Sequence, residues 1–226
     1  MKKKKGQNMK IFLDTANVKK VKELAHLGII DGITTNPTHL AHEKEKPTAI
    51  IQELARIIPG DISVEVTEKV PAKVYAQAKE IAKLAKNIVV KIPCHADYYE
   101  IIQKLMAEDI SINITLVFSL MQALFMCKLG VAYISPFVGR LNDIDADGMN
   151  LLHEIRSMID NYGFSTEIIA ASIRTVTDFH EAITAISDII TVPVSVLEKS
   201  LDHPLTNTGI EKFLADWKNT KIIQFP

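Results

Sequence analysis

The sequence has little of several features that would place it in a specialised class. Its two cysteines, Cys94 and Cys127, lack CxxC spacing, so we expect neither a disulfide framework nor a cysteine zinc site. This cysteine usage fits a reducing compartment such as the cytoplasm. No apolar run approaches the roughly 18 residues of a membrane span. The basic start MKKKKGQN is not followed by the apolar stretch of a signal peptide. We therefore expect a cytoplasmic protein with no membrane contact, and a basic disordered tail over residues 1–8.

The sequence also has no excess of positive or negative charge. The 226 residues include 26 Lys and Arg against 27 Asp and Glu, for a net charge of -1, so neither nucleic acid nor a membrane is the default partner. The seven histidines form no HxxxH or HExxH pair, and we expect no metal site. A composition of 47% hydrophobic and 23% charged residues suits one globular domain with a large core.

What the sequence has is an alternation of short β-rich runs with helical patterns. The predicted strands are residues 10–14, 32–35, 62–66, 88–92, 112–115, 132–136, 167–172 and 188–193. Helical periodicity lies between them, as at Val74, Ala78 and Ile81. Eight strand–helix units without a break predict an α/β protein with a (β/α)₈ TIM barrel. The rival, a doubly wound open sheet, usually has a Gly-rich first turn, whereas the first turn here is DTANV.

Several predicted strands also alternate polar and apolar residues. SVEV sets Ser63 and Glu65 on one face and two valines on the other, and SINIT sets Asn113 and Thr115 on one face and two isoleucines on the other. In a barrel one strand face meets the helices and the other the lumen, so the polar set should point inward. A half-exposed antiparallel strand is the commoner cause of alternation, but the intervening helices count against it. Barrel active sites lie at the carboxyl ends of the strands. The polar residues predicted there are Asp14, Thr34, Asn36, Glu65, Lys91, Asn113, Thr115, Ser135, Arg140, Ser172 and Arg174.

Lys91 is the most unusual of these residues. It lies in KNIVVKIP, whose branched side chains suit a central strand covered on both faces, where lysine is rarely found. Burial favours the neutral amine, and the neutral amine is the nucleophile that forms a Schiff base with a carbonyl substrate. A carboxylate close to the amine would oppose this effect, so we expect Glu65 to act through a water molecule rather than as a direct ion pair. From the strand alone, a snorkelling side chain or a buried ion pair explains Lys91 equally well.

Two arginines follow the sixth and seventh predicted strands. SPFVGR ends at Arg140 and AASIR at Arg174, with Ser172 between them. Guanidinium groups suit phosphate oxygens, and the loops after late barrel strands often bind phosphate. These residues therefore predict a phosphate site. Taken singly, each arginine is more often a surface residue paired with an acid such as Asp143 or Glu167.

The chain also resembles a known family, on motifs that run from about Lys10 to about Asn219. The motifs are FLDTAN, DGITTNPT, IVVKIP, INITLVFS, SPFVGRLNDI, NYGFSTEIIAASIR and HPLTNTGIEKFLADW. Together they are similar to the transaldolase family, in the short subgroup that also contains the fructose-6-phosphate aldolases. The resemblance implies a TIM barrel with an additional C-terminal helix, here one domain over residues 9–220 followed by a tail at 221–226. It implies a homo-oligomer, commonly a decamer, in which that helix packs on a neighbouring subunit. The apolar stripe that fits this role is Ile210, Phe213, Leu214 and Trp217.

The resemblance also implies roles for the polar residues. Lys91 matches the Schiff-base lysine and Asp14 the acid/base group, so no metal or organic cofactor is needed. Glu65 and Thr115 match the pair that holds the catalytic water. The substrate-binding residues are expected to be Asn36 and Asn113 for the dihydroxyacetone part, Arg140, Ser172 and Arg174 for phosphate, and Thr34, Ser135 and Phe137 beside them.

The predicted function is that of a transaldolase of the pentose phosphate pathway, which moves a dihydroxyacetone unit from sedoheptulose 7-phosphate to glyceraldehyde 3-phosphate. In the similar aldolases a glutamine stands at the position of Glu65 and a tyrosine at that of Phe137, so this chain has the transaldolase pair. An aldolase that releases free dihydroxyacetone, and a barrel that binds sugar phosphates without turnover, stay open. Two further residues stand out. His39 lies where an apolar residue is more usual, and Cys94 near Lys91 is expected to be a packing residue, since no basic partner is evident.

Overall fold

The computed structural model describes residues 8–220 and contains eight short parallel strands. They are β1 (Lys10–Asp14), β2 (Gly32–Thr34), β3 (Ile62–Glu65), β4 (Ile88–Pro93), β5 (Ile112–Val117), β6 (Tyr133–Pro136), β7 (Glu167–Ala170) and β8 (Ile189–Val192). Every predicted run coincides with a strand, and the boundaries differ by at most two residues. The branched apolar runs therefore located the whole sheet.

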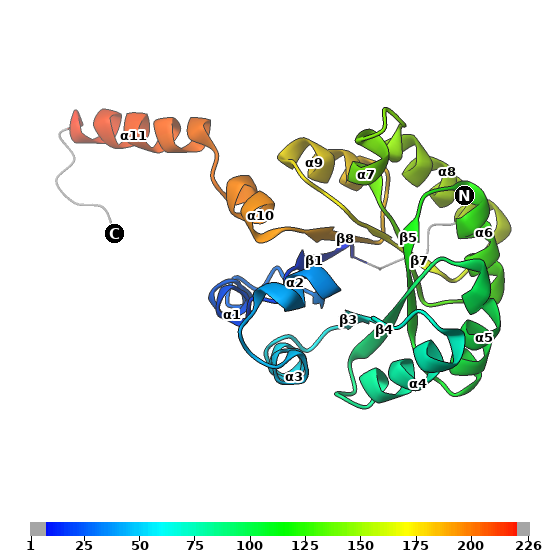
Figure 1. The fold of residues 1–226 in the computed structure, drawn as a ribbon. Helices are drawn as coiled ribbons and strands as arrows, with labels where there is room; N and C mark the ends of the chain where they lie inside the picture. The colour runs from blue at the N-terminus through cyan, green and yellow to red at the C-terminus, as the bar shows by residue number, and fades with distance from the viewer. Residues whose placement is uncertain (1–7, 221–226) are drawn as a thin grey trace.

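Helices follow the strands and form the outer layer of the molecule (Figure 1). They are α1 (Val18–Ala25), α2 (Pro37–His42), α3 (Pro47–Ile57), α4 (Pro71–Ala82), the 3₁₀ turn η1 (Ala96–Tyr98), α5 (Tyr99–Ala107), α6 (Leu120–Leu129), α7 (Val138–Asn142), α8 (Gly148–Tyr162), α9 (Val176–Thr184), α10 (Val194–Leu201) and α11 (Pro204–Lys218). Several of their ends are encoded locally. The side chain of Asp147 accepts a hydrogen bond from the backbone of Asn150 to begin α8, and Gly163, with φ of 69°, ends it in the left-handed conformation.

The sheet closes on itself, which confirms the (β/α)₈ barrel and makes the open-sheet alternative wrong. The strands follow one another in chain order, and β1 pairs with both β2 and β8 in parallel register. The additional C-terminal helix is also present. α10 leads away from β8, and α11 projects from the barrel (Figure 1).

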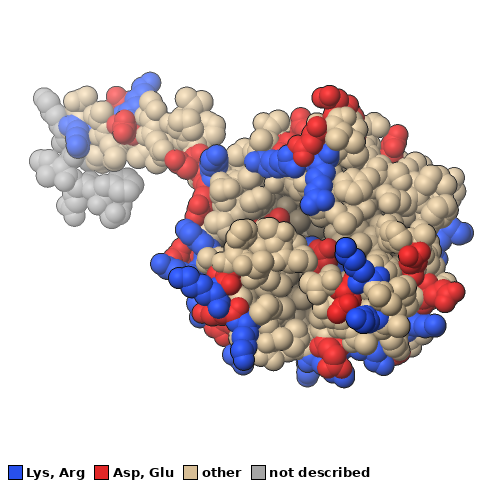
Figure 2. All heavy atoms as spheres, viewed as in Figure 1, with Lys and Arg blue, Asp and Glu red and all other residues tan. Residues whose placement is uncertain are grey.

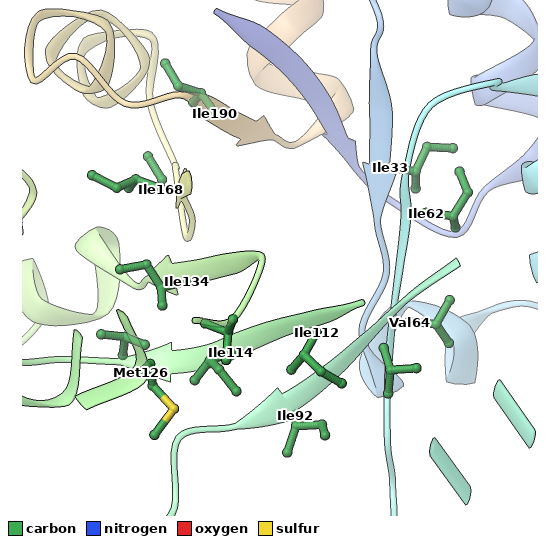
Figure 3. Close-up of a cluster of buried hydrophobic side chains, with 14 of the residues drawn as sticks. Ile33, Ile62, Val64, Ile92, Ile112, Ile114, Met126, Ile134, Ile168 and Ile190 are labelled. Atoms are coloured by element: carbon green, nitrogen blue, oxygen red, sulfur yellow. The ribbon is translucent and has the colours of Figure 1, made fainter. Parts of the chain in front are cut away.

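The two faces of each strand meet different surroundings. Figure 3 shows the outer face, where Ile33, Val64 and Ile114 are buried toward the helices. The inner face alternates with it, and its lower layer is a separate apolar cluster of Phe12, Ile169 and Ile189. The next inward positions along the strands are polar, as the alternation predicted. The barrel therefore has an apolar floor beneath a polar mouth.

The predicted tails, 1–8 and 221–226, lie outside the described residues except for Asn8. Within residues 8–220, no helix combines the length and the apolar character that a bilayer crossing requires. The same part of the chain holds no group of three or more His, Cys, Asp or Glu side chains placed to bind a metal ion.

Candidate active site

A pocket of about 220 Å³ opens at the carboxyl ends of the strands. Its lining comprises Asp14, Thr34, Asn36, Lys91, Ser135, Phe137, Arg140, Ala171, Ser172, Arg174 and Thr191. Nine of the twelve residues predicted for the site are in this set. Glu65, Asn113 and Thr115 are not, because they lie behind the lining.

Lys91 lies in the wall of this pocket and is only 4% exposed. Its Nζ donates a hydrogen bond of 2.7 Å to the carbonyl oxygen of Thr35 and lies 3.0 Å from Oε2 of Glu65. Lys91 is a residue of β4, and the other residues of this strand from Ile88 to Ile92 are buried and apolar. A single amine is thus fixed at the edge of the pocket by two oxygen atoms.

The contact between Glu65 and Lys91 corrects one prediction. We expected Glu65 to act through a water molecule, whereas the structure has a direct ion pair. The reason is register, because Glu65 and Lys91 are directly opposite on the neighbouring strands β3 and β4. Adjacent strands lie about 4.8 Å apart and opposite side chains point the same way, so both groups meet inside the barrel. The buried ion pair that the sequence left open for Lys91 is therefore present.

Asp14 ends β1 and also lines the pocket. Its Oδ1 accepts a hydrogen bond of 3.0 Å from the hydroxyl of Thr34, and that hydroxyl lies 2.6 Å from the hydroxyl of Thr191. A second group near Oδ1 is Nδ1 of His39, at 3.6 Å. Sequence reasoning named Asp14 and Thr34 but missed Thr191. The alternation of β8, which places Thr191 on the same face as Ile189, was the signal that pointed to it.

Asn36 and His39 form the turn that carries the chain from β2 into α2. Oδ1 of Asn36 accepts a hydrogen bond of 2.8 Å from the backbone N–H of His39 and so caps the helix. Nδ2 of Asn36 lies 3.3 Å from Nδ1 of the His39 ring. The capping bond holds Asn36 at the pocket edge, where its amide is predicted to face a substrate.

Asn113 does not face the pocket as a free amide. Its Nδ2 donates to the hydroxyl of Ser63 and its Oδ1 accepts from the hydroxyl of Ser135, both at 2.8 Å. All three residues are buried. This chain of hydrogen bonds crosses strands β3, β5 and β6 and fixes the Ser135 side chain, which lines the pocket.

Thr115 lies on β5 where the strand is irregular. The pairing of β5 with β6 shifts register between Ile114 and Val117, and Leu116 takes a positive φ of 58°. Such a bulge changes the direction of a strand near a site. The hydroxyl of Thr115 is completely buried and has no hydrogen-bond partner among the described residues, which is uncommon for a buried polar group.

The arginine side of the pocket is built by the loops after β6 and β7. Arg174 is held by Asp143, with a hydrogen bond of 2.6 Å from Nη2 to Oδ2, as the surface-pair alternative proposed. Arg140 lies over the ring of Phe137, 5.1 Å from its centroid. Ser172 has a positive φ of 63°, and strained non-glycine backbone is concentrated at functional sites.

Gly139 lets these two loops approach each other. A Cβ atom there would lie 2.2 Å from the carbonyl oxygen of Ser172 and 3.0 Å from Nε of Arg174. No side chain fits in that space without a shift of the backbone. Two cations, Arg140 and Arg174, thus lie together in the lining of the pocket.

Cys94 follows β4 but does not have the character of a reactive thiol. Burial raises its pKa from 9.0 to about 11, so the nucleophilic thiolate is scarce at neutral pH. The side chain packs against the main apolar core, and neither cysteine is in a disulfide. These observations support the prediction of a packing residue.

Known proteins resemble this chain over most of its length. Residues 11–223 match a family model described as transaldolase/fructose-6-phosphate aldolase. A probable transaldolase from Thermodesulfovibrio yellowstonii is 45% identical over 213 residues, which cover 94% of this chain and 100% of that protein. A probable transaldolase from Lactiplantibacillus plantarum is 46% identical over 210 residues, covering 93% of this chain and 97% of that one.

Two solved structures share the fold at low sequence identity. Thiamine phosphate pyrophosphorylase from Pyrococcus furiosus matches with a TM-score of 0.56 at 19% identity, over 83% of this chain and 86% of that one. A mutant flavocytochrome b2 with pyruvate bound matches with a TM-score of 0.59 at 12% identity, over 82% of this chain and 56% of that one. At these identities the match concerns the barrel alone.

Proposed function

This chain belongs to the transaldolase/fructose-6-phosphate aldolase family, and we propose that it is a transaldolase working through a Schiff base on Lys91. In the proposed reaction, a dihydroxyacetone unit passes from sedoheptulose 7-phosphate to glyceraldehyde 3-phosphate. The products are erythrose 4-phosphate and fructose 6-phosphate. The observation that carries the proposal is a single buried amine at the pocket wall, with a carboxylate beside it and a second carboxylate in the same pocket lining.

The first step is attack of the Lys91 amine on the ketone carbon. An ammonium group must lose a proton before it can attack, and Oε2 of Glu65, 3.0 Å away, is placed to accept that proton. Loss of water from the carbinolamine needs a group that returns a proton to the departing hydroxyl. Glu65 and the unpartnered Thr115 hydroxyl are proposed to handle that water. The iminium that results withdraws electrons from the substrate.

The second step is cleavage of the C3–C4 bond. Asp14 takes the proton of the C4 hydroxyl as the electron pair of the bond moves toward the iminium, which leaves an enamine on Lys91. The first aldehyde leaves, the acceptor aldehyde enters, and Asp14 returns the proton to the new hydroxyl. Thr34 supports this role because its hydroxyl donates to Oδ1 of Asp14 and so orients the carboxylate.

The phosphate group is proposed to bind at the rim formed by Arg140, Ser172 and Arg174. Planar guanidinium groups suit phosphate oxygens. A phosphate that reaches Arg174 has to replace Asp143, whose pair with that arginine is about half exposed. Exposed pairs of this kind are weak, so the exchange costs little.

Transfer rather than release requires that the enamine wait for an aldehyde. Phe137 lines the pocket and offers no hydroxyl to the intermediate, and its ring keeps water from that side. The similar aldolases have a tyrosine there. An aldolase that releases dihydroxyacetone, or a barrel without turnover, is the competing proposal.

One assay separates the three possibilities. Fructose 6-phosphate is supplied as donor with and without erythrose 4-phosphate, and both sedoheptulose 7-phosphate and free dihydroxyacetone are measured. A transaldolase forms product only with the acceptor, an aldolase releases dihydroxyacetone without it, and a binding protein does neither. Borohydride added with fructose 6-phosphate should inactivate the enzyme and add mass to Lys91. A label on another lysine would contradict the assigned nucleophile, and Lys91→Ala is the matched control.

We further propose a cytoplasmic homo-oligomer, a decamer by family resemblance. Helix α11 projects from the barrel and exposes Ile210, Phe213 and Leu214 (Figures 1 and 2). An exposed apolar helix face of this kind usually meets a partner, and here the proposed partner is a second copy of the chain. Light scattering of the wild type and of Phe213→Asp would test it, since the variant should have the lower mass.

A further inference from the structure

His39 lies beside the proposed acid/base group, at a position where the family more usually has an apolar residue. It belongs to the first turn of α2, and its ring nitrogen Nδ1 lies 3.6 Å from Oδ1 of Asp14 and 3.3 Å from Nδ2 of Asn36. The side chain is 29% exposed and that of Asp14 is 23% exposed. The imidazole therefore joins two residues that line the pocket.

The hydrogen bonds of Asn36 determine which ring nitrogen carries the proton. Its Oδ1 accepts the backbone N–H of His39 at 2.8 Å, so the NH₂ group is the end that faces the ring. An NH₂ group only donates, and Nδ1 must therefore accept. This orientation of Asn36 suits the imidazole tautomer that has its proton on Nε2 and a lone pair on Nδ1.

That lone pair distinguishes the two protonation states of Asp14. An ionised carboxylate only accepts hydrogen bonds, so Oδ1 and Nδ1 repel each other, and 3.6 Å is too long for a hydrogen bond. A protonated Asp14 can donate its O–H to Nδ1 if the two atoms approach by about 0.6–0.9 Å, which brings them to the length of an ordinary hydrogen bond. Hydrogen bonds of catalytic groups often shorten in this way during the reaction.

We propose that His39 is a positioning residue that holds the proton on Asp14 between the two halves of the transfer reaction. The inference rests on the proposed function. Asp14 gains one proton from the C4 hydroxyl when the C3–C4 bond breaks, and it gives the same proton to the new hydroxyl when the enamine attacks the acceptor. Between these events the O–H of Asp14 points to Nδ1 of His39.

The direction of that O–H decides between transfer and release. Protonation of the enamine carbon by a nearby acid, followed by hydrolysis of the iminium, would free dihydroxyacetone. An O–H that is donated to Nδ1 of His39 is not available to the enamine carbon on Lys91, so His39 suppresses release. In the described part of the chain, Asp14 is the acid within 4.0 Å of the ring. The other groups on Oδ1 of Asp14 and on Nδ1 are the Thr34 hydroxyl and the Asn36 amide, which are uncharged.

The experiment compares His39→Ile, His39→Asn and the wild type. Isoleucine removes the acceptor, whereas the carbonyl oxygen of asparagine can replace Nδ1. His42→Ile, an exposed position on the same helix, is the matched control. With fructose 6-phosphate as donor and erythrose 4-phosphate as acceptor, the measured quantity is the ratio of released dihydroxyacetone to transferred product. His39→Ile should raise this ratio about threefold to tenfold, the effect of one ordinary hydrogen bond.

His39→Asn should restore most of the wild-type ratio, and His42→Ile should leave it unchanged. A structural role alone would lower transfer and release together, so an unchanged ratio in His39→Ile overturns the inference. An increase in His39→Asn equal to that in His39→Ile overturns it as well. The borohydride label on Lys91 should form in every variant. If the wild type neither turns over nor takes the label, the proposed function fails and this inference fails with it.

Discussion

The ion pair between Lys91 and Glu65 leads to a quantitative prediction for stability. The two side chains are 6% and 14% exposed, and Nζ has Glu65 and the Thr35 carbonyl oxygen as its acceptors. Glu65→Ala leaves a buried ammonium with the neutral carbonyl alone. Removal of one partner from a buried pair costs about 3–5 kcal/mol. Because Glu65 is slightly open to solvent, we expect a loss of about 3 kcal/mol in the free energy of unfolding.

Four further variants isolate the charge contribution, and one of them is Lys91→Met alone, the second single variant of the double-mutant cycle. Glu65→Gln keeps an acceptor oxygen and should lose about 1–2 kcal/mol, the difference between a charged and a neutral hydrogen bond. The double variant Lys91→Met with Glu65→Ala removes both charges, so its loss should be smaller than the sum of the two single losses by about 2 kcal/mol. Glu80→Ala is the matched control, since its pair with Lys83 has side chains 72% and 67% exposed and should contribute nothing measurable.

The assay is urea unfolding at pH 7, with every variant at the same protein concentration because assembly adds to apparent stability. Additive losses in the double variant would refute the reasoning. They would mean that Lys91 and Glu65 are each stabilised by other groups and not by one another.

Two other predictions concern the pocket, and a third concerns the buried thiol of Cys94. Phe137→Tyr should raise the ratio of released dihydroxyacetone to transferred product, because a hydroxyl then reaches the side of the pocket that holds the enamine on Lys91. If a coupled assay shows that both rates fall equally, Phe137 has only a packing role. Arg140→Ala and Arg174→Ala should each weaken use of phosphorylated substrates by about tenfold to a hundredfold. Equal losses with unphosphorylated donors would argue against a phosphate contact. Burial raises the pKa of Cys94 to about 11, so its thiol should react with iodoacetamide about a hundredfold more slowly at pH 8 than a free thiol. The rate should rise as the pH approaches 11. A rate at pH 8 equal to that of free cysteine would contradict the buried thiol.

The fold could be predicted from local patterns because the barrel repeats one unit, a short strand followed by a helix, eight times. Runs such as Ile88–Ile92 are apolar on both faces or alternate strictly, and each is followed by a helical period. A closed parallel barrel is the simplest fold in which eight such strand–helix units bury their apolar faces. The inward direction of Glu65 and Asn113 followed from the alternation in SVEV and SINIT, without any knowledge of partners.

The partners themselves could not be predicted, because they depend on register and on loop paths. The direct pair of Glu65 with Lys91 needs the β3–β4 register. The sequence named Asp143 as one of two acids that could pair with an arginine, but the choice of Asp143 for Arg174 depends on loops 31 residues apart. The hydrogen bonds of Asn113 with Ser63 and Ser135 were likewise not predicted, and its expected role in substrate binding stays a prediction. Hydrogen bonds of this kind are decided by which neighbour is closest once the barrel has closed.

Closure of the barrel by the last strand has a consequence for synthesis on the ribosome. β1 carries Asp14, but one edge of β1 pairs with β8, and the hydroxyl of Thr34 that orients Asp14 lies 2.6 Å from that of Thr191. Until residue 191 has left the exit tunnel, a nascent chain has an open β1 edge and an incomplete support for its acid/base group. The lysine side of the pocket, built by β3, β4 and β5, involves segments that emerge much earlier. A growing chain therefore completes the groups around its nucleophile before it can complete those around its proton donor.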